Sequence, residues 1–257
     1  MDGQWARCIW ETKRMPSDPS QLLLNVVFLD LLLALITVVF FWLGVSVVRG
    51  LGRQGSYSLA PLGIQKPKFG YSSGILLGFL VGIGALAGSL LLIPLSFYVL
   101  EWLGYSTERS VQGPLMQGLA AWIEESPGVG VPATVAVVVF FGPAVEELIF
   151  RGAFFGGLYR LGLFFSRKLA GKDRGERKNI GERISFALSA VFSSAVFALA
   201  HGEAAVVPVL LVLAFVLCTL YRRTGSLLPC LVTHATFNAF AVMLVILSGF
   251  GVMPTPA

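Results

Sequence analysis

Three ionisable residues interrupt an apolar stretch in the second half of the chain. The run VPATVAVVVFFGPA carries no charge, and Glu146, Glu147 and Arg151 follow it before the apolar residues AFFGGLY. Charged groups inside membrane segments are costly, and they usually pair with one another or mark a functional site. The stretch therefore predicts either a salt bridge that joins helices or a reactive group kept away from bulk water.

The spacing of the three charges separates the two glutamates. Residues four apart lie on nearly the same face of a helix, whereas adjacent residues lie about 100° apart. We therefore expect Glu147 to pair with Arg151 within one helix, which offsets much of the cost of holding either charge in the membrane. Glu146 points elsewhere and is left for a different helix. Because an unpaired buried acid is expensive, this surplus carboxylate favours a functional role over a purely structural ion pair.

Both histidines of the chain lie in apolar segments. FALAHG places Phe197 four residues before His201, and THATFN places His234 four residues before Asn238, so each pair shares a helix face. A single histidine in such surroundings is commonly a satisfied core residue. Two of them, together with the spare carboxylate of Glu146, favour polar chemistry. We expect Phe197 to pack against the site rather than to react.

These motifs resemble those of a known family. EELIFR fits an E-E-x-x-x-R pattern, FALAH fits F-x-x-x-H and HATFN fits H-x-x-x-N, in this order and on separate apolar segments. The set is similar to that of the CPBP intramembrane proteases, which include CAAX prenyl proteases and bacteriocin-processing (Abi) enzymes. The stretch YRRTGSLLPCLVTHATFN, residues 221–238, resembles the link between the last core helices of that family. The resemblance covers about 130–250.

The resemblance implies a role for each matching residue. Glu146 would activate a water molecule as general base, assisted by His201. His234 and Asn238 would stabilise the oxyanion that forms when the water attacks a peptide carbonyl, and donors placed in this way are worth about 3–4 kcal/mol. The predicted salt bridge would hold the helix. The chain would then be an intramembrane endopeptidase that acts on a membrane-associated or lipidated protein or peptide.

A metal-dependent form of this reaction stays open at this stage. Glu146, His201 and His234 could ligate Zn²⁺ and leave a position for water. The H-E-x-x-H motif of many zinc proteases is absent from the sequence. We favour a mechanism without a cofactor, with a divalent metal such as zinc as the alternative.

Two other functional classes fit the same residues. A buried acid with two histidines could relay protons in a membrane transporter, although the chain shows no inverted repeat. A non-catalytic scaffold that binds a membrane peptide is the other class. Cleavage of a reporter peptide by the purified protein, abolished by Glu146→Ala, would separate all three.

The composition predicts the framework that must position these residues. Of 257 residues, 56% are hydrophobic and 13% are charged, and the mean hydropathy is +0.79. Soluble domains contain about 25% charged residues. About six apolar segments approach the roughly 20 residues that a bilayer requires, which predicts an all-α, polytopic bundle of membrane helices. The expected spans are 22–48, 72–100, 132–160, 184–201, 204–221 and 226–249.

The segments between the spans differ in charge. Residues 101–131 are expected to form an acidic loop on the outer side of the membrane. Hairpin strands in this loop would be the only departure from an all-α structure. Residues 160–183 are expected to form a strongly basic loop. Together with 49–71 and 222–225 this loop holds fourteen Lys and Arg, against four in the tails and the outer loops. Lys and Arg are enriched on the cytoplasmic side, so both termini are expected outside.

The same features indicate partners and location. The net charge of +5 reflects the basic loops, and it suits anionic lipid rather than nucleic acid. We expect membrane lipid and a peptide substrate as partners, and a multi-pass protein of a bacterial plasma membrane. Cys8, Cys218 and Cys230 show no metal-type spacing and are expected to be buried apolar groups.

The proposed site can form only by folding, because its residues come from three segments. We expect the side chains of Glu146, His201, His234 and Asn238 within about 10 Å of one another, with one water between the first two. Counting along an ordinary span would put His201 at the outer surface. We therefore expect its helix to end within about three residues of Gly202, which is allowed at that depth beside a polar cavity. The chain divides into a tail with two spans (1–130), a catalytic core (131–250) and a short tail (251–257).

Overall fold

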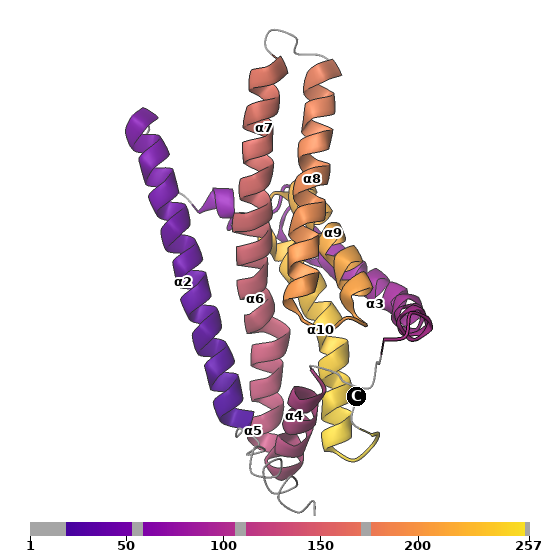
Figure 1. Ribbon diagram of the computed structural model, residues 1–257. Coiled ribbons are helices and arrows are strands. Elements are labelled where there is room, and N and C mark those ends of the chain that lie inside the picture. Colours follow the sequence, from indigo (N-terminus) through magenta and orange to yellow (C-terminus); the bar gives the residue numbers. More distant parts are fainter. Residues whose placement is uncertain (1–18, 53–58, 106–111, 171–175, 255–257) are drawn as a thin grey trace, which may run out of the picture.

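A computed structural model describes residues 19–52, 59–105, 112–170 and 176–254. Within these ranges the regular secondary structure is helical and includes no strand, which confirms the all-α fold (Figure 1). Six helical segments are long and apolar enough to cross a membrane, as expected. They are Leu23–Phe41, Tyr71–Trp102, Pro127–Lys168, Lys178–Ala200, Val207–Thr224 and Leu227–Gly249.

The helical elements follow one another with short connections. The first two spans lie in α2 and α3, the third is built from five consecutive elements, and the last three are α8, α9 and α10. The bounds are α2 Pro19–Gly52, η1 Ala60–Leu62, α3 Tyr71–Trp102, α4 Gly113–Glu125, α5 Pro127–Thr134, η2 Val135–Phe141, α6 Gly142–Glu147, η3 Leu148–Phe155, α7 Gly156–Ala170, α8 Glu176–Ala200, α9 Val207–Thr224 and α10 Leu227–Gly249.

The third span contains two π-helical segments, η2 and η3, on either side of the short helix α6. In η2 the backbone N–H of Gly142 reaches back five residues to the carbonyl of Val137. The next residue, Pro143, has no N–H and its ring crowds the carbonyl one α-turn earlier, which favours a wider turn before it. π-Helical turns inside α-helices are often found at functional sites. Here they bracket the two glutamates.

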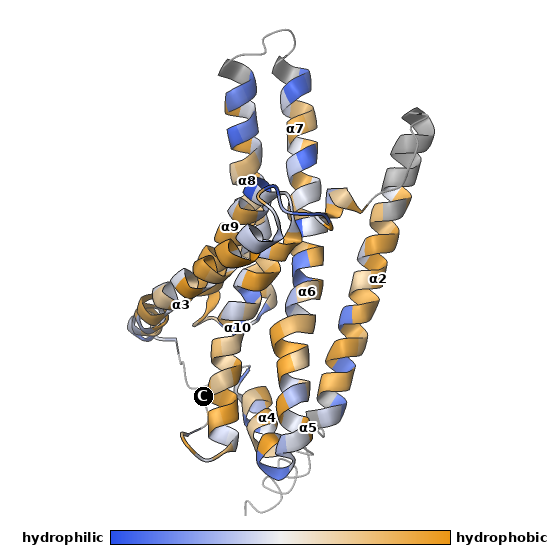
Figure 2. Cartoon of the chain, turned by 180° about the vertical axis from the view of Figure 1, so that it is seen from behind, coloured by the Kyte–Doolittle hydropathy of each residue, from blue (hydrophilic) through white to orange (hydrophobic). Residues whose placement is uncertain are grey.

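Two segments that were predicted to be loops are mostly helical. The basic segment 160–183 continues the third span as α7 up to Ala170 and enters α8 from Glu176. The outer turns of α7 and α8 project beyond the rest of the bundle and are hydrophilic (Figure 2). The acidic segment 101–131 contains α4 and most of α5 rather than hairpin strands. Its residues 106–111 lie outside the described ranges.

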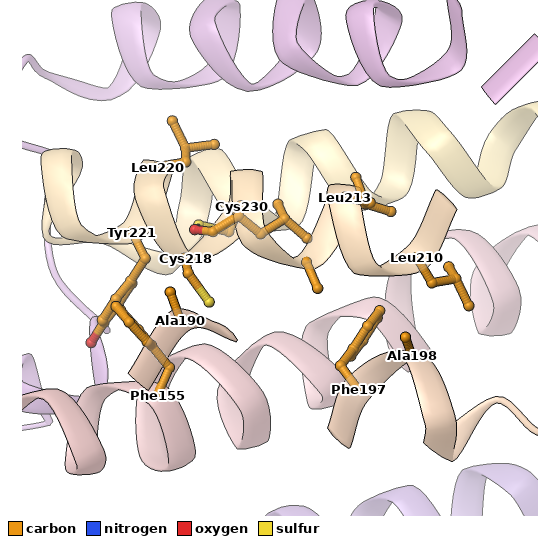
Figure 3. Packing of buried hydrophobic residues seen from close by; sticks show 12 residues of the cluster. Phe155, Ala190, Phe197, Ala198, Leu210, Leu213, Cys218, Leu220, Tyr221 and Cys230 are labelled. Carbon is orange, nitrogen blue, oxygen red and sulfur yellow. The ribbon is translucent and has the colours of Figure 1, made fainter. Parts of the chain in front are cut away.

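Helix α10 lies at the centre of the bundle, where it packs against α3, α4, α9 and the third span. The largest buried cluster surrounds Phe155, Phe197 and the inner face of α9 (Figure 3). Cys218 and Cys230 are buried in it, as expected, whereas Cys8 lies outside the described residues. The division of the chain at residue 130 stays a prediction, and α3 from its first part packs along α10 from its second.

Helix α2 is the least enclosed span. Its N-terminal end lies beside α4 and α5, and its C-terminal end stands away from α7 (Figure 1). It packs against α4, α6 and the two π segments. Leu23 is buried at the α4 end, whereas Phe28 and Phe40 are about 70% exposed. The face of α2 turned away from the bundle is therefore available to lipid.

The connection between α2 and α3 is tied to the turn between α9 and α10. We call residues 59–70 the strap. Its backbone carbonyls accept hydrogen bonds from Leu227 and Ser226 (2.9 and 2.6 Å), and its Lys68 N–H donates to the carbonyl of Thr224 (3.1 Å). The strap also approaches the third span, where a side chain on Gly152 would place its Cβ 2.6 Å from the carbonyl oxygen of Leu62. Glycine at this position is therefore required by packing.

Candidate active site

A buried ionic network lies at the end of α6. Arg151 Nη1 is 3.0 Å from Glu147 Oε1, one helical turn away, as the spacing predicts. The same oxygen lies 2.8 Å from Nδ1 of His234 on α10. All three residues are buried, with 0%, 1% and 2% of the surface exposed for Glu147, Arg151 and His234. The expectation that only Glu146 reaches another helix was wrong, because Glu147 contacts α10 as well.

Phe197 covers this network from α8. The guanidinium of Arg151 lies over its ring at 4.3 Å, a distance at which a cation is attracted to the ring face. The ring also meets His234, at 5.8 Å between centroids, and His201, at 4.7 Å. Phe197 is fully buried. It therefore packs between the two histidines and separates the ion pair from the apolar core.

Glu146 lies on the opposite edge of the His234 ring. Its Oε2 atom is 3.7 Å from Nε2 of His234, and its side chain is one third exposed. That oxygen is itself buried and accepts no hydrogen bond from the described residues. The imidazole thus stands between two glutamates, one bonded at Nδ1 and one close to Nε2. Of the two acids, only Glu146 retains an accessible carboxyl group.

His201 lies where α8 ends. The helix stops at Ala200, and Gly202 has φ +68°, a conformation that glycine adopts without strain. The predicted end near Gly202 is thus confirmed. His201 Nδ1 is 2.8 Å from the carbonyl oxygen of Phe197, and because a carbonyl only accepts, Nδ1 must carry the hydrogen. In the neutral ring, Nε2 is then free to accept a proton or a hydrogen bond.

Asn238 lies one helical turn beyond His234 on α10 and faces the first π segment. Its amide donates a hydrogen bond of 3.1 Å to the carbonyl of Val138. Because His234 meets the end of α6 while Asn238 meets an earlier residue, α10 and the third span run in opposite directions here. The structure thus brings Glu146 directly to His234, joins His201 to His234 through the Phe197 ring, and places Asn238 one turn away.

The zinc ligands suggested by the sequence do not form a ligand set in this structure. Among the described residues, no group of three His, Cys, Asp or Glu side chains is arranged to hold a metal ion. The Nδ1 atoms of His201 and His234 face a backbone carbonyl and Glu147, respectively. A catalytic zinc site needs three protein ligands around one point, and binding of zinc by Glu146, His201 and His234 stays a prediction.

Asp30 of α2 also lies beside this face of α6, and the sequence motifs did not indicate it. A Cβ on Gly142, one turn before Glu146, would lie 3.8 Å from Asp30 Oδ2. The carboxyl groups of Asp30 and Glu146 are close enough to interact electrostatically. Asp30 is the one charged residue in the apolar run 23–41. An isolated charge in a membrane span is a functional signal in itself, and by this criterion Asp30 could have been found.

Comparison with known proteins finds a family model that matches part of the chain. Residues 128–240 match the model for type II CAAX prenyl endopeptidase, Rce1-like. They form an Rce1-like domain. No curated protein and no solved structure gives a match to the chain.

The matched segment contains every motif residue that sequence analysis selected, from Glu146 to Asn238, and leaves out α2 and α3. The Rce1-like domain belongs to a family of proteases, and CAAX-type proteases are hydrolases that act on membrane-associated proteins or peptides. With six apolar helices, the chain is a multi-pass membrane protein. The match supports a protease and favours neither the transporter nor the scaffold.

Proposed function

We propose that this protein is an intramembrane endopeptidase that hydrolyses a peptide bond of a lipidated or membrane-held substrate with a water molecule activated by Glu146. The observation that carries the proposal is the contrast between two adjacent acids around one imidazole. Glu147 is fully buried and paired, whereas Glu146 is one third exposed and has a buried oxygen without a hydrogen-bond donor. A carboxylate in this state can accept a proton from water.

The proposed reaction uses only groups of the chain. Glu146 removes a proton from the water, the water oxygen bonds to the carbonyl carbon, and the carbonyl π electrons move to the oxygen. When the C–N bond breaks, the proton on Glu146 passes to the departing amine, so the products are a carboxylic acid and an amine. His201 assists by accepting a hydrogen bond at Nε2 from the second O–H of the water, whose hydrogen stays on the new carboxyl group; the Nδ1 contact of His201 leaves Nε2 available.

The oxyanion would be stabilised from α10. His234 faces Glu147 through Nδ1, so it can donate from Nε2 as an imidazolium, with the Glu147 carboxylate holding its ring. Asn238 uses one amide hydrogen on Val138 and has a second for the oxyanion. Donors fixed before the reaction stabilise developing charge without reorganisation. We propose that neither zinc nor another cofactor is needed for these steps.

The experiment compares two isosteric variants of adjacent residues. The purified full-length chain in lipid nanodiscs is given a fluorogenic peptide with a C-terminal prenyl group, and cleavage is followed for wild type, Glu146→Gln and Glu147→Gln. Glu146→Gln should abolish cleavage and keep the wild-type melting temperature. Full cleavage by Glu146→Gln would refute the mechanism. Cleavage that disappears with a chelator and returns with zinc would refute the metal-free form alone.

We also propose that the protein lies in a bacterial plasma membrane with the strap and the outer turns of α7 and α8 in the cytoplasm. The support is the concentration of Lys and Arg at this end of the bundle. A cysteine placed at Lys168, in a background without Cys8, tests the orientation. It should react with a membrane-impermeant maleimide in inverted vesicles and not in intact cells, and the reverse result would overturn the assignment.

A further inference from the structure

Asp30 has no role in the reaction proposed above, although its position is costly. It lies about 10 Å along the helix from Leu23, which places it near the middle of the first span. No Lys, Arg or His among the described residues pairs with it. A charge at such a depth is usually retained for a function. What Asp30 faces therefore matters.

The face of α6 that carries Gly142 and Glu146 is the face turned toward α2. The two residues are four apart, so they share a side of the helix. Gly142 has no side chain, and Asp30 Oδ2 lies 3.8 Å from the position that its Cβ would occupy. Glu146 thus stands between His234 on α10, at 3.7 Å, and Asp30 on α2.

A peptide that is cut inside a membrane needs hydrogen-bond acceptors for its backbone N–H groups. To present its carbonyl, the substrate must be extended around the scissile bond, and its backbone N–H groups then lack helical partners. Each N–H without a partner in apolar surroundings is expensive. A carboxylate on α2, opposite Glu146 and next to a residue without a side chain, is an acceptor for such groups.

We propose that Asp30 is a substrate-binding residue, which accepts hydrogen bonds from backbone N–H groups of an extended membrane peptide lying against α2 and α6. This inference rests on the proposed endopeptidase function and adds a substrate-binding residue outside the Rce1-like domain. Asp30 lies beside Gly142 and interacts electrostatically with Glu146, and no Lys, Arg or His of the described residues pairs with it, which favours a hydrogen-bond donor there. The occupant is thus a neutral, extended peptide segment rather than a helix, whose N–H groups are already bonded.

The test separates binding from turnover. In the inactive Glu146→Gln background, the affinity of the prenylated fluorescent peptide is measured by anisotropy, alone and with Asp30→Leu, Asp30→Asn or Asn25→Leu added. Asp30→Leu removes the acceptor and should weaken binding about tenfold or more, as expected for a hydrogen bond to a charged group. Asp30→Asn keeps a carbonyl acceptor and should lose less than about threefold. Asn25→Leu removes an exposed polar group of the same helix and should change nothing.

Kinetics with Glu146 intact give the second arm. Asp30→Leu should raise KM and leave kcat within about twofold, because the interaction is made before and during the reaction. A fall in kcat at unchanged KM, or equal binding losses in Asp30→Asn and Asp30→Leu, would overturn a backbone-acceptor role. Unchanged binding in Asp30→Leu would overturn it while leaving the function of Glu146 intact. If Glu146→Gln still cleaves the peptide, the proposed catalytic mechanism is refuted. The binding measurements on the Asp30 variants then still decide whether Asp30 binds the peptide.

The stability of the variants guards against a trivial loss of fold. Replacing a mid-membrane acid by Leu removes a costly group, so Asp30→Leu should melt at or above the wild-type temperature. A residue kept only to hold α2 against the bundle would give the opposite sign. A lower melting temperature in both Asp30 variants, with binding lost in proportion, would therefore count against the proposal.

Discussion

The two edges of the His234 ring meet glutamates in opposite states. On the Nδ1 side, Glu147 is buried, bonded to the imidazole and to Arg151, and covered by Phe197. On the Nε2 side, Glu146 lies 3.7 Å away with an exposed third. The paired side offsets the cost of carrying charge in the membrane, and the open side carries the carboxylate that we propose as the general base. Adjacent positions on one helix thus provide a paired half and an accessible half.

The sharpest test of this contrast is the loss of each carboxylate in turn. Glu146→Gln should reduce the cleavage rate by about a thousandfold, as expected for a general base, with little effect on unfolding. Glu147→Gln should lower the melting temperature and affect cleavage through His234. Peptide cleavage and thermal unfolding of the two proteins, measured side by side, decide the matter. Equal effects of the two changes on both quantities would erase the distinction between the halves.

The stability of the protein should depend strongly on the Glu147–Arg151 pair, and removing one partner should cost the most. Arg151→Met leaves Glu147 buried without its cation, and breaking a buried pair in this way costs about 3–5 kcal/mol. The double variant Glu147→Gln, Arg151→Met removes both charges and should recover part of this loss. Unfolding in detergent measures both values. A double variant less stable than Arg151→Met would show that the pair is not the source of the sensitivity.

Phe197 connects the two halves, and its replacement should have an intermediate effect. Phe197→Leu removes the ring that lies 4.3 Å from the Arg151 guanidinium, an interaction of about 1–2 kcal/mol at a buried site. Phe155→Leu is the matched control on the third span, because Phe155 is also fully buried and packs against the rings of Tyr159 and Phe186. We expect a larger drop in melting temperature for Phe197→Leu. Equal drops would argue that general packing, rather than the cation, is what Phe197 supplies.

The smallest expected effect concerns the turn that ends α8. Gly202→Ala introduces no clash, because nothing lies within 4 Å of the added Cβ, but φ +68° costs a residue with a side chain about 1–2 kcal/mol. Gly128→Ala, also free of contacts but inside α5, should be neutral or slightly stabilising. Unfolding of both variants gives the difference. If Gly202→Ala matches Gly128→Ala, the turn adapts and does not fix His201.

Local spacing predicted local geometry well. The pair Glu147–Arg151 and the end of the helix near Gly202 both depend on a few consecutive residues, and both are found. The bond between Glu147 and His234 joins residues 87 apart, and spacing along one helix cannot show which glutamate meets a distant ring. The π segments add to this difficulty, because they change the angle between successive residues from the usual 100°.

Charge misled the assignment of helix ends. The charge of residues 160–183 predicts a loop, yet Arg, Lys and Glu are good helix formers, and α7 and α8 extend into this segment, up to Ala170 and from Glu176. Asp30 shows a different limit of prediction from sequence. It belongs to no motif, and its relation to Glu146 exists only because α2 packs on α6. Sequence motifs thus selected the candidate residues, whereas the contacts between spans could be found only from the folded structure.

The strap has a consequence for biogenesis. Residues 59–70 leave the ribosome early, but their hydrogen-bond partners between Thr224 and Leu227 belong to the turn before the final span. That span also brings His234 to Glu147. Because chains are synthesised from the N-terminus, we expect the candidate active site to be incomplete until α10 inserts. Newly made neighbours in the membrane would therefore meet the complete site only after α10 has docked.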